Sequence, residues 1–172
     1  SLLLGSSSEV QFIVHFLNYL KNKNDLEAKA HFLYYLAQKN KEKIAAHDFI
    51  SSGMEQKEET DFQKWLFDFD FEISFTTIRK KSLYEAVELI ISKAISIEKR
   101  NAYVQYFLDV VLERDLKNQA GISDFLNYWE TQKEKLSIPS PEGNDAIRIM
   151  TIHKSKGLEF PVVIFPFAEE DY

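Results

Sequence analysis

Residues 147–165 read Ile-Arg-Ile-Met-Thr-Ile-His-Lys-Ser-Lys-Gly-Leu-Glu-Phe-Pro-Val-Val-Ile-Phe. A β-branched apolar run ends at Thr151, a lysine-rich polar turn ends at Gly157, and a second apolar run follows. This pattern predicts a buried strand, a phosphate-facing turn and a second buried strand. Because the turn lies close to Tyr172, we expect the chain to hold only part of the α/β fold to which it belongs.

The side chains of this turn suit a phosphate-bearing ligand. A turn that follows a parallel strand presents backbone N–H groups and the positive end of a helix dipole. A Thr and a His can donate hydrogen bonds to phosphate oxygens, two Lys add charge, a Gly permits close approach, and a Glu can accept from a sugar hydroxyl. The alternative is a surface connection with merely solvated polar groups. The candidate residues are Thr151, His153, Lys154, Lys156, Gly157 and Glu159.

The preceding residues show helical periodicity instead. Ser6, with Glu9 three positions later, forms a capping-box pattern before the first apolar stripe, and Ser82 with Glu85 repeats it. Asp25 and Ser123 are suitable caps for two further helices. Residues 40–59 are polar, and we expect a loop with one short helix there. The predicted apolar faces contain Val10, Ile13, Val14, Leu17, Leu20, Ala28, Phe32, Leu33, Leu36, Phe62, Trp65, Leu66, Phe69, Val87, Ile90, Ile91, Ala94, Tyr103, Tyr106, Phe107, Val110, Val111, Phe125, Leu126, Trp129 and Leu136.

These patterns predict a mainly α-helical chain with short strands at both ends. We expect residues 1–5 to be a strand-like flank, residues 6–138 a helical block, residues 139–145 a Pro- and Gly-containing linker, and residues 146–172 the strand–turn–strand unit. One geometry explains this order. The helical block is an insertion in an α/β domain, and both flanks belong to that host.

Composition limits the function classes. Apolar residues make up 45% of the 172 residues and aromatic residues 14%, which indicates a packed core. No apolar run approaches the roughly 18 residues of a membrane span, and the start lacks signal-peptide features. The chain contains no Cys, which excludes thiolate metal sites and Cys nucleophiles. We therefore expect a cytoplasmic protein without a membrane partner.

The charge argues against a nucleic-acid binder that acts by electrostatics alone. Net charge is −6; residues 1–145 contain 18 Lys and Arg against 23 Asp and Glu, and residues 146–172 contain 3 against 4. Neither part has the basic excess of a stand-alone DNA-binding domain. Any contact with DNA must depend on a few placed groups, and we expect weak or no DNA binding by this chain alone.

The string Thr-Ile-His-Lys-Ser-Lys-Gly-Leu-Glu-Phe at 151–160, with Ile-Arg-Ile-Met before it and Pro-Val-Val-Ile after it, resembles motif V of the UvrD/Rep-type superfamily 1 DNA helicases. It is most similar to the RecB/AddA helicase–nucleases. Leu2–Leu4, Ser8-Glu9-Val10 and Asn24-Asp25 resemble the segment after motif IV. The helical block then falls where the family inserts subdomain 2B into the RecA-like subdomain 2A.

This resemblance implies roles for the turn. By likeness to the motif, Thr151, His153 and Lys154 are expected at the single-stranded DNA backbone. Lys156 and Gly157 are expected to face the nucleotide. The resemblance also places Glu159 on the ribose of ATP. It further implies ATP and Mg²⁺ for the full-length protein, 3′–5′ unwinding of DNA in repair or recombination, and a nuclease domain or partner subunit.

The 172 residues contain no G-x-x-x-x-G-K-[ST] loop and no arginine-bearing motif VI. We therefore expect no catalytic residue and no metal site in the chain, and no ATP hydrolysis by it alone. An alternative remains, in which the helical block is a regulatory or protein-interaction module of a helicase-like protein without its own ATPase activity. A Walker A loop upstream would favour the motor.

Four weaker patterns have structural explanations that we favour. Asp68, Asp70 and Glu72 alternate like metal ligands but lack a fourth ligand nearby. The other patterns are three scattered histidines, a short basic run that might contact duplex DNA, and two aromatic clusters that might stack on bases. We expect structural or exposed histidines, a solvated basic loop and aromatic residues in the core. These residues are His15, His31, His47, Arg79, Lys80, Lys81, Tyr34, Tyr35 and Phe67–Phe71.

Overall fold

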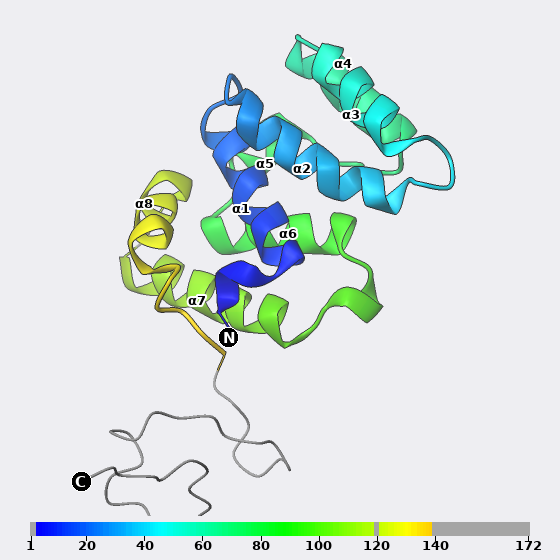
Figure 1. The fold of residues 1–172 in the computed structure, drawn as a ribbon. Helices are drawn as coiled ribbons and strands as arrows, with labels where there is room; N and C mark the ends of the chain where they lie inside the picture. The colour runs from blue at the N-terminus through cyan, green and yellow to red at the C-terminus, as the bar shows by residue number, and fades with distance from the viewer. Residues whose placement is uncertain (1–2, 119–120, 139–172) are drawn as a thin grey trace, which may run out of the picture. The chain divides into compact units, whose positions relative to one another are not determined.

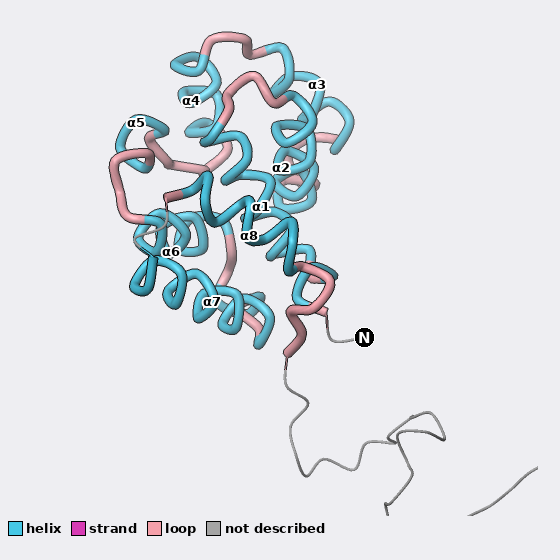
Figure 2. Tube along the Cα trace, turned by 90° about the vertical axis from the view of Figure 1, so that its left-hand side faces the viewer, coloured by secondary structure: helices cyan, strands magenta, loops and turns pink. Residues whose placement is uncertain are grey.

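A computed structural model describes residues 3–118 and 121–138 of the chain. They form eight α-helices and two 3-10 helices, and Figure 2 shows helices and loops throughout this part of the chain. The mainly helical prediction is therefore confirmed. The elements are η1 (Leu4–Ser6), α1 (Ser8–Lys21), α2 (Leu26–Lys39), α3 (Ala46–Glu55), α4 (Glu59–Asp68), α5 (Phe75–Ile78), α6 (Leu83–Ala94), η2 (Ile97–Lys99), α7 (Ala102–Asn118) and α8 (Ile122–Gln132).

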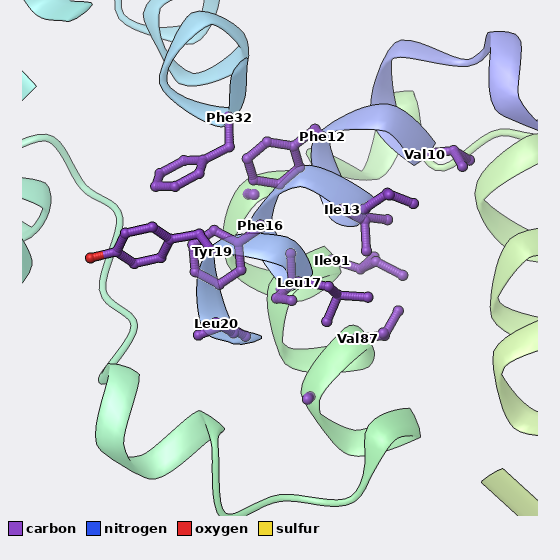
Figure 3. Packing of buried hydrophobic residues seen from close by; sticks show 14 of the residues in the cluster. Val10, Phe12, Ile13, Phe16, Leu17, Tyr19, Leu20, Phe32, Val87 and Ile91 are labelled. Atoms are coloured by element: carbon purple, nitrogen blue, oxygen red, sulfur yellow. The ribbon is translucent and has the colours of Figure 1, made fainter. Parts of the chain in front are cut away.

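Helix α1 is the centre of the core. Eight of its residues are buried, so the helix is covered on nearly all sides, as expected of a helix inside a packed unit. It contacts α2 as well as α6, α7 and α8, while α3 and α4 extend the packing beyond α2 (Figure 1). Figure 3 shows Phe16 and Leu17 of α1 among the side chains of this core, with Phe32 from α2 and Val87 and Ile91 from α6.

Helix starts agree with the sequence in part. Asp25 accepts a hydrogen bond from the backbone N–H of Ala28 at 2.8 Å, and Ser82 and Glu85 form a complete capping box, as predicted. The first cap is Ser7 and not Ser6, because the Ser6 hydroxyl instead donates to the carbonyl of Leu3 within η1.

The start of the last helix differs from the prediction. Helix α8 begins after Gly121, so Ser123 lies inside its first turn and does not cap it. Gly121 has no side chain to bond the free N–H groups of that turn. Residues 40–59 contain one short helix, α3, as expected.

Helices α3 and α4 meet through aromatic rings. Phe49 of α3 lies 4.8 Å from Trp65 of α4 and 4.9 Å from Phe69, measured between ring centroids. The Trp65 indole N–H donates to the Ser52 hydroxyl at 3.0 Å, so its polar edge is satisfied. Gly53 makes the contact possible, because a Cβ there would lie 2.9 Å from the Trp65 ring. The expected core role of the Phe67–Phe71 cluster therefore holds for Phe69.

The first and last described residues of the helical unit lie side by side. Leu3 forms an isolated antiparallel bridge with Ser137, and the Leu4 N–H donates to the Leu136 carbonyl at 2.8 Å. The predicted strand at residues 1–5 differs from the structure beyond Leu3, because Leu4 begins a 3-10 turn and its side chain is fully buried in the helical core. Burial of Leu4 explains why the chain turns here instead of extending.

Residues 1–140 form one compact unit and residues 141–172 a second. In the part of the chain that the structure describes, no helix has both the length and the apolar character needed to cross a membrane.

Candidate functional site

The predicted phosphate-facing turn lies outside the described residues. This applies to all six candidates, so their roles remain predictions: Thr151, His153, Lys154, Lys156, Gly157 and Glu159. The expected linker at 139–145 lies outside them as well. The described helices can nevertheless be searched for ionisable and aromatic groups that are available to a ligand.

Arg79 is committed to holding helices together. Its Nη1 and Nη2 donate to the two carboxylate oxygens of Glu59 at 2.7 and 2.6 Å, and its Nε donates to the Leu20 carbonyl at 2.9 Å. The hydrogen bond from Arg79 is the largest cause lowering the pKa of Glu59. The basic run at 79–81 is therefore only partly a solvated loop, because Arg79 links the end of α1 to the start of α4, while Lys80 and Lys81 are exposed.

Lys29 is a buried cation that the sequence analysis missed. Its side chain lies inside the unit, where Nζ donates to the Gln56 carbonyl at 2.6 Å and sits 4.0 Å from the centroid of the Phe62 ring. Burial lowers its pKa to about 8. The ammonium joins α2 to the connection between α3 and α4, so we assign it a structural role.

The alternating acidic residues do not gather into a metal site. Asp70 pairs with Lys43 at 2.6 Å, and Glu72 lies 4.0 Å from Lys93. No group of three His, Asp or Glu side chains with metal-binding geometry occurs among residues 3–118 and 121–138. Asp70 also has a positive φ of 61°, a conformation that Asp tolerates better than most residues.

Two histidines that are far apart in sequence stack on each other. The rings of His15 in α1 and His31 in α2 lie 4.3 Å apart at an interplanar angle of 14°. One helical turn away, Phe12 and Tyr35 stack at 4.4 Å and 27°. A residue one turn later in α1 thus pairs with one a turn earlier in α2, as antiparallel helices require.

These rings line a continuous surface groove, which we call the His15–His31 groove. It consists of three adjoining cavities of about 450, 220 and 110 Å³. The first two share the pair of histidines, and the last two share Tyr35, Gln38 and Lys99. The groove therefore runs from Trp129 and Lys133 at α8, across α1 and α2, to Lys99 in η2.

Sequence reasoning named both histidines but placed them on separate elements. The signal that could have joined them is the short connection of residues 22–25, which forces α1 and α2 to be antiparallel neighbours. The aromatic pair at 34–35 also divides. Tyr35 packs against Phe12 as expected of a core residue, whereas Tyr34 is 59% exposed and lines the groove.

Comparison with known proteins gives three relatives that share part of this sequence. The chain is 35% identical over 78 residues, 42% of its length, to an ATP-dependent helicase/nuclease subunit of Lacticaseibacillus casei (strain BL23). It is 34% identical over 113 residues, 55% of its length, to the ATP-dependent helicase/nuclease subunit of the same name in Clostridioides difficile (strain 630). It is 56% identical over 58 residues, 31% of its length, to RecBCD enzyme subunit RecB of Buchnera aphidicola subsp. Baizongia pistaciae (strain Bp).

These alignments cover 6%, 9% and 5% of the respective relatives, so the chain corresponds to a small part of each. No solved structure matches the chain significantly. The family model of the UvrD-like helicase C-terminal domain matches residues 6–172, which includes both the helical unit and the string at 151–160. The chain therefore belongs to the UvrD-like helicase C-terminal domain family.

Proposed function

We propose that this chain is part of an ATP-dependent 3′–5′ DNA helicase of the helicase–nuclease type, acting in DNA repair or recombination. The match of the family model to residues 6–172 carries the proposal. The names of the relatives support it, since they are ATP-dependent helicase/nuclease subunits and a RecBCD subunit. The whole protein would act on ATP with Mg²⁺ and on DNA in the cytoplasm, with a nuclease domain or partner subunit.

The helical unit would be an insertion in a RecA-like host. The bridge between Leu3 and Ser137 supports this arrangement, because an inserted unit must begin and end at neighbouring points to leave its host undisturbed. In this scheme residues 6–138 are the insertion, residues 139–145 the linker, and residues 1–5 and 146–172 the parts of the host.

The turn at 151–160 would contact both ligands. Thr151, His153 and Lys154 would donate to the backbone of single-stranded DNA, and Lys156 and Gly157 would face the phosphates of ATP. The carboxylate of Glu159 would accept hydrogen bonds from the ribose. A single loop between the two ligands would move when either one binds, which would couple ATP hydrolysis to movement along DNA.

Two variants of the full-length protein separate these roles. Glu159→Ala should raise the KM for ATP about tenfold, the cost of one charge-assisted hydrogen bond. His153→Ala should raise the DNA concentration needed for half-maximal ATPase stimulation and leave the KM for ATP nearly unchanged. Glu42→Ala and His47→Ala are matched controls, because both residues are exposed and make no hydrogen bond with described residues.

Unchanged ATP turnover and unchanged DNA dependence in both variants would contradict the assignment of the turn. A full-length protein that binds DNA but hydrolyses no ATP would favour the alternative role, a regulatory or interaction module. The 172-residue chain alone should hydrolyse no ATP, since it contains no Walker A loop.

A further inference from the structure

The His15–His31 groove has aromatic surfaces that a planar ligand can reach. The side chain of His31 is 53% exposed and Tyr34 is 59% exposed, so each offers a ring face to solvent. His15 lies beneath His31, and burial lowers its pKa, which keeps this imidazole neutral at pH 7. A neutral aromatic stack that ends at a solvent-exposed ring can be extended by one further planar group.

The groove is also the place where positive charge gathers on an acidic chain. Three lysines and one glutamate line its three cavities, although the chain carries a net charge of −6. Lys133 pairs with the one glutamate, Glu130, at 2.7 Å. Lys39 and Lys99 at the opposite end have no acidic partner among the described residues.

Two carboxylates at the border oppose an anionic ligand. Glu27 Oε1 lies 3.9 Å from His31 Nε2, and the charge of Glu9 contributes to raising the pKa of Tyr35 to about 12. Any anion in the groove must therefore gain most of its affinity from stacking, with charge as a secondary contribution. Amide groups complete the lining. Gln38 is exposed there, whereas the Gln11 amide donates to the Gly5 carbonyl.

From this combination we propose that the His15–His31 groove binds a short single strand of nucleic acid. An unpaired base stacks on His31 and a second on Tyr34, the amide of Gln38 meets a base edge, and Lys39 and Lys99 face the phosphates. A duplex does not fit this chemistry, because its bases are already stacked and paired. The contact goes beyond the proposed function, since none of these residues belongs to the turn at 151–160.

The test is a titration of the ¹⁵N-labelled 172-residue chain with an eight-nucleotide oligo(dT), followed by NMR at 50 mM salt. We expect saturable shifts centred on His15, His31, Tyr34 and Lys99, with a Kd of about 10–100 µM, which is within the non-specific range. Affinity this weak agrees with the acidic charge of the chain. Salt should weaken the binding with a shallow slope, because only two ammonium groups face phosphates.

Variants distinguish stacking from charge. Tyr34→Ala and His31→Ala should each weaken binding about five- to tenfold, and Lys99→Gln about threefold with a shallower salt dependence. Glu27→Gln should strengthen binding. Phe67→Ala, which removes a 43% exposed ring from α4 outside the groove, is the matched control and should change nothing.

Other outcomes would overturn the proposal. These are an absence of shifts at 500 µM oligonucleotide, shifts confined to residues 146–172, equal binding of a blunt duplex, or unchanged affinity of both Tyr34→Ala and His31→Ala. Preference for an amphipathic peptide over oligo(dT) would assign the groove to a protein partner instead. His153→Ala should leave the groove shifts intact, so failure of the groove is distinguishable from failure of the proposed helicase function.

Discussion

Removal of the Arg79 guanidinium should destabilise the helical unit strongly, because three helices depend on it. Arg79→Met keeps most of the aliphatic stem but deletes two hydrogen bonds to Glu59 and one to the Leu20 carbonyl. The side chains of Arg79 and Glu59 are 29% and 19% exposed, so the pair is partly desolvated. Loss of the guanidinium leaves the carboxylate and a helix-terminal carbonyl unpaired.

The magnitude follows from these contacts. A hydrogen bond to a charged group contributes about 1.5–3 kcal/mol, and solvent at the remaining exposed surface screens part of this. We expect Arg79→Met to lower the free energy of unfolding by about 2–4 kcal/mol, equivalent to a fall in Tm of roughly 6–12 °C for a unit of this size. Urea unfolding followed by circular dichroism at 222 nm measures it directly.

The dependence on pH gives a second readout. Pairing with Arg79 lowers the pKa of Glu59 in the folded state, so the stability that the pair contributes is present above the unfolded pKa near 4.5. That stability is lost as pH falls through the folded pKa. The difference between wild type and Arg79→Met should therefore shrink as pH is lowered from 7 toward 3.

A double-mutant cycle completes the test. Glu59→Gln combined with Arg79→Met should cost about 1–2 kcal/mol less than the sum of the single changes. Lys64→Met is the control, because its ammonium lies 3.9 Å from Asp61 on an exposed face and should matter by less than about 0.5 kcal/mol. A loss below 1 kcal/mol for Arg79→Met, or a loss independent of pH, would refute the reasoning.

Three further outcomes follow from the packing. Because burial lowers the Lys29 pKa to about 8 from 10.5, the unfolded state holds the extra proton between these values, and stability should rise by about 1–2 kcal/mol from pH 7 to 9.5; the rise should be absent from urea unfolding of Lys29→Met. Gly53→Ala should cost about 1–3 kcal/mol in thermal unfolding despite the better helix propensity of Ala, since the new Cβ would lie 2.9 Å from both Leu33 and Trp65; a neutral result would mean that Trp65 moves easily. Gly121→Ser should stabilise the unit by about 0.5–1 kcal/mol, because it adds a side-chain cap to α8 where nothing lies within 4 Å of the new Cβ; a lower Tm would contradict this cap.

Local patterns predicted the helices well because their causes are local. The caps at Asp25 and Ser82 depend on atoms within three residues, and the apolar stripes of α1 and α6 follow from helical spacing alone. The first cap moved from Ser6 to Ser7 because burial of Leu4 and the bridge from Leu3 to Ser137 set the turn. That bridge joins residues 134 positions apart, which no local pattern encodes.

The functional groups divide along the same line. The string at 151–160 is informative because its residues are contiguous, and it pointed to the family that the match over residues 6–172 shows. Lys29 and Arg79 owe their roles to Gln56, Phe62, Glu59 and Leu20, all brought close by tertiary packing. The stack of His15 on His31 required the antiparallel arrangement of α1 and α2.

The most direct test of the central claim is an unwinding assay with the full-length protein, ATP and Mg²⁺ on duplexes that carry a 3′ or a 5′ single-stranded tail. We predict unwinding of the 3′-tailed duplex, little unwinding of the 5′-tailed one, and at least a tenfold slower rate in Glu159→Ala than in Glu42→Ala. Absence of ATP-dependent unwinding on both duplexes, or equal rates in the two variants, would contradict the proposal that this chain supplies the coupling turn of a helicase motor.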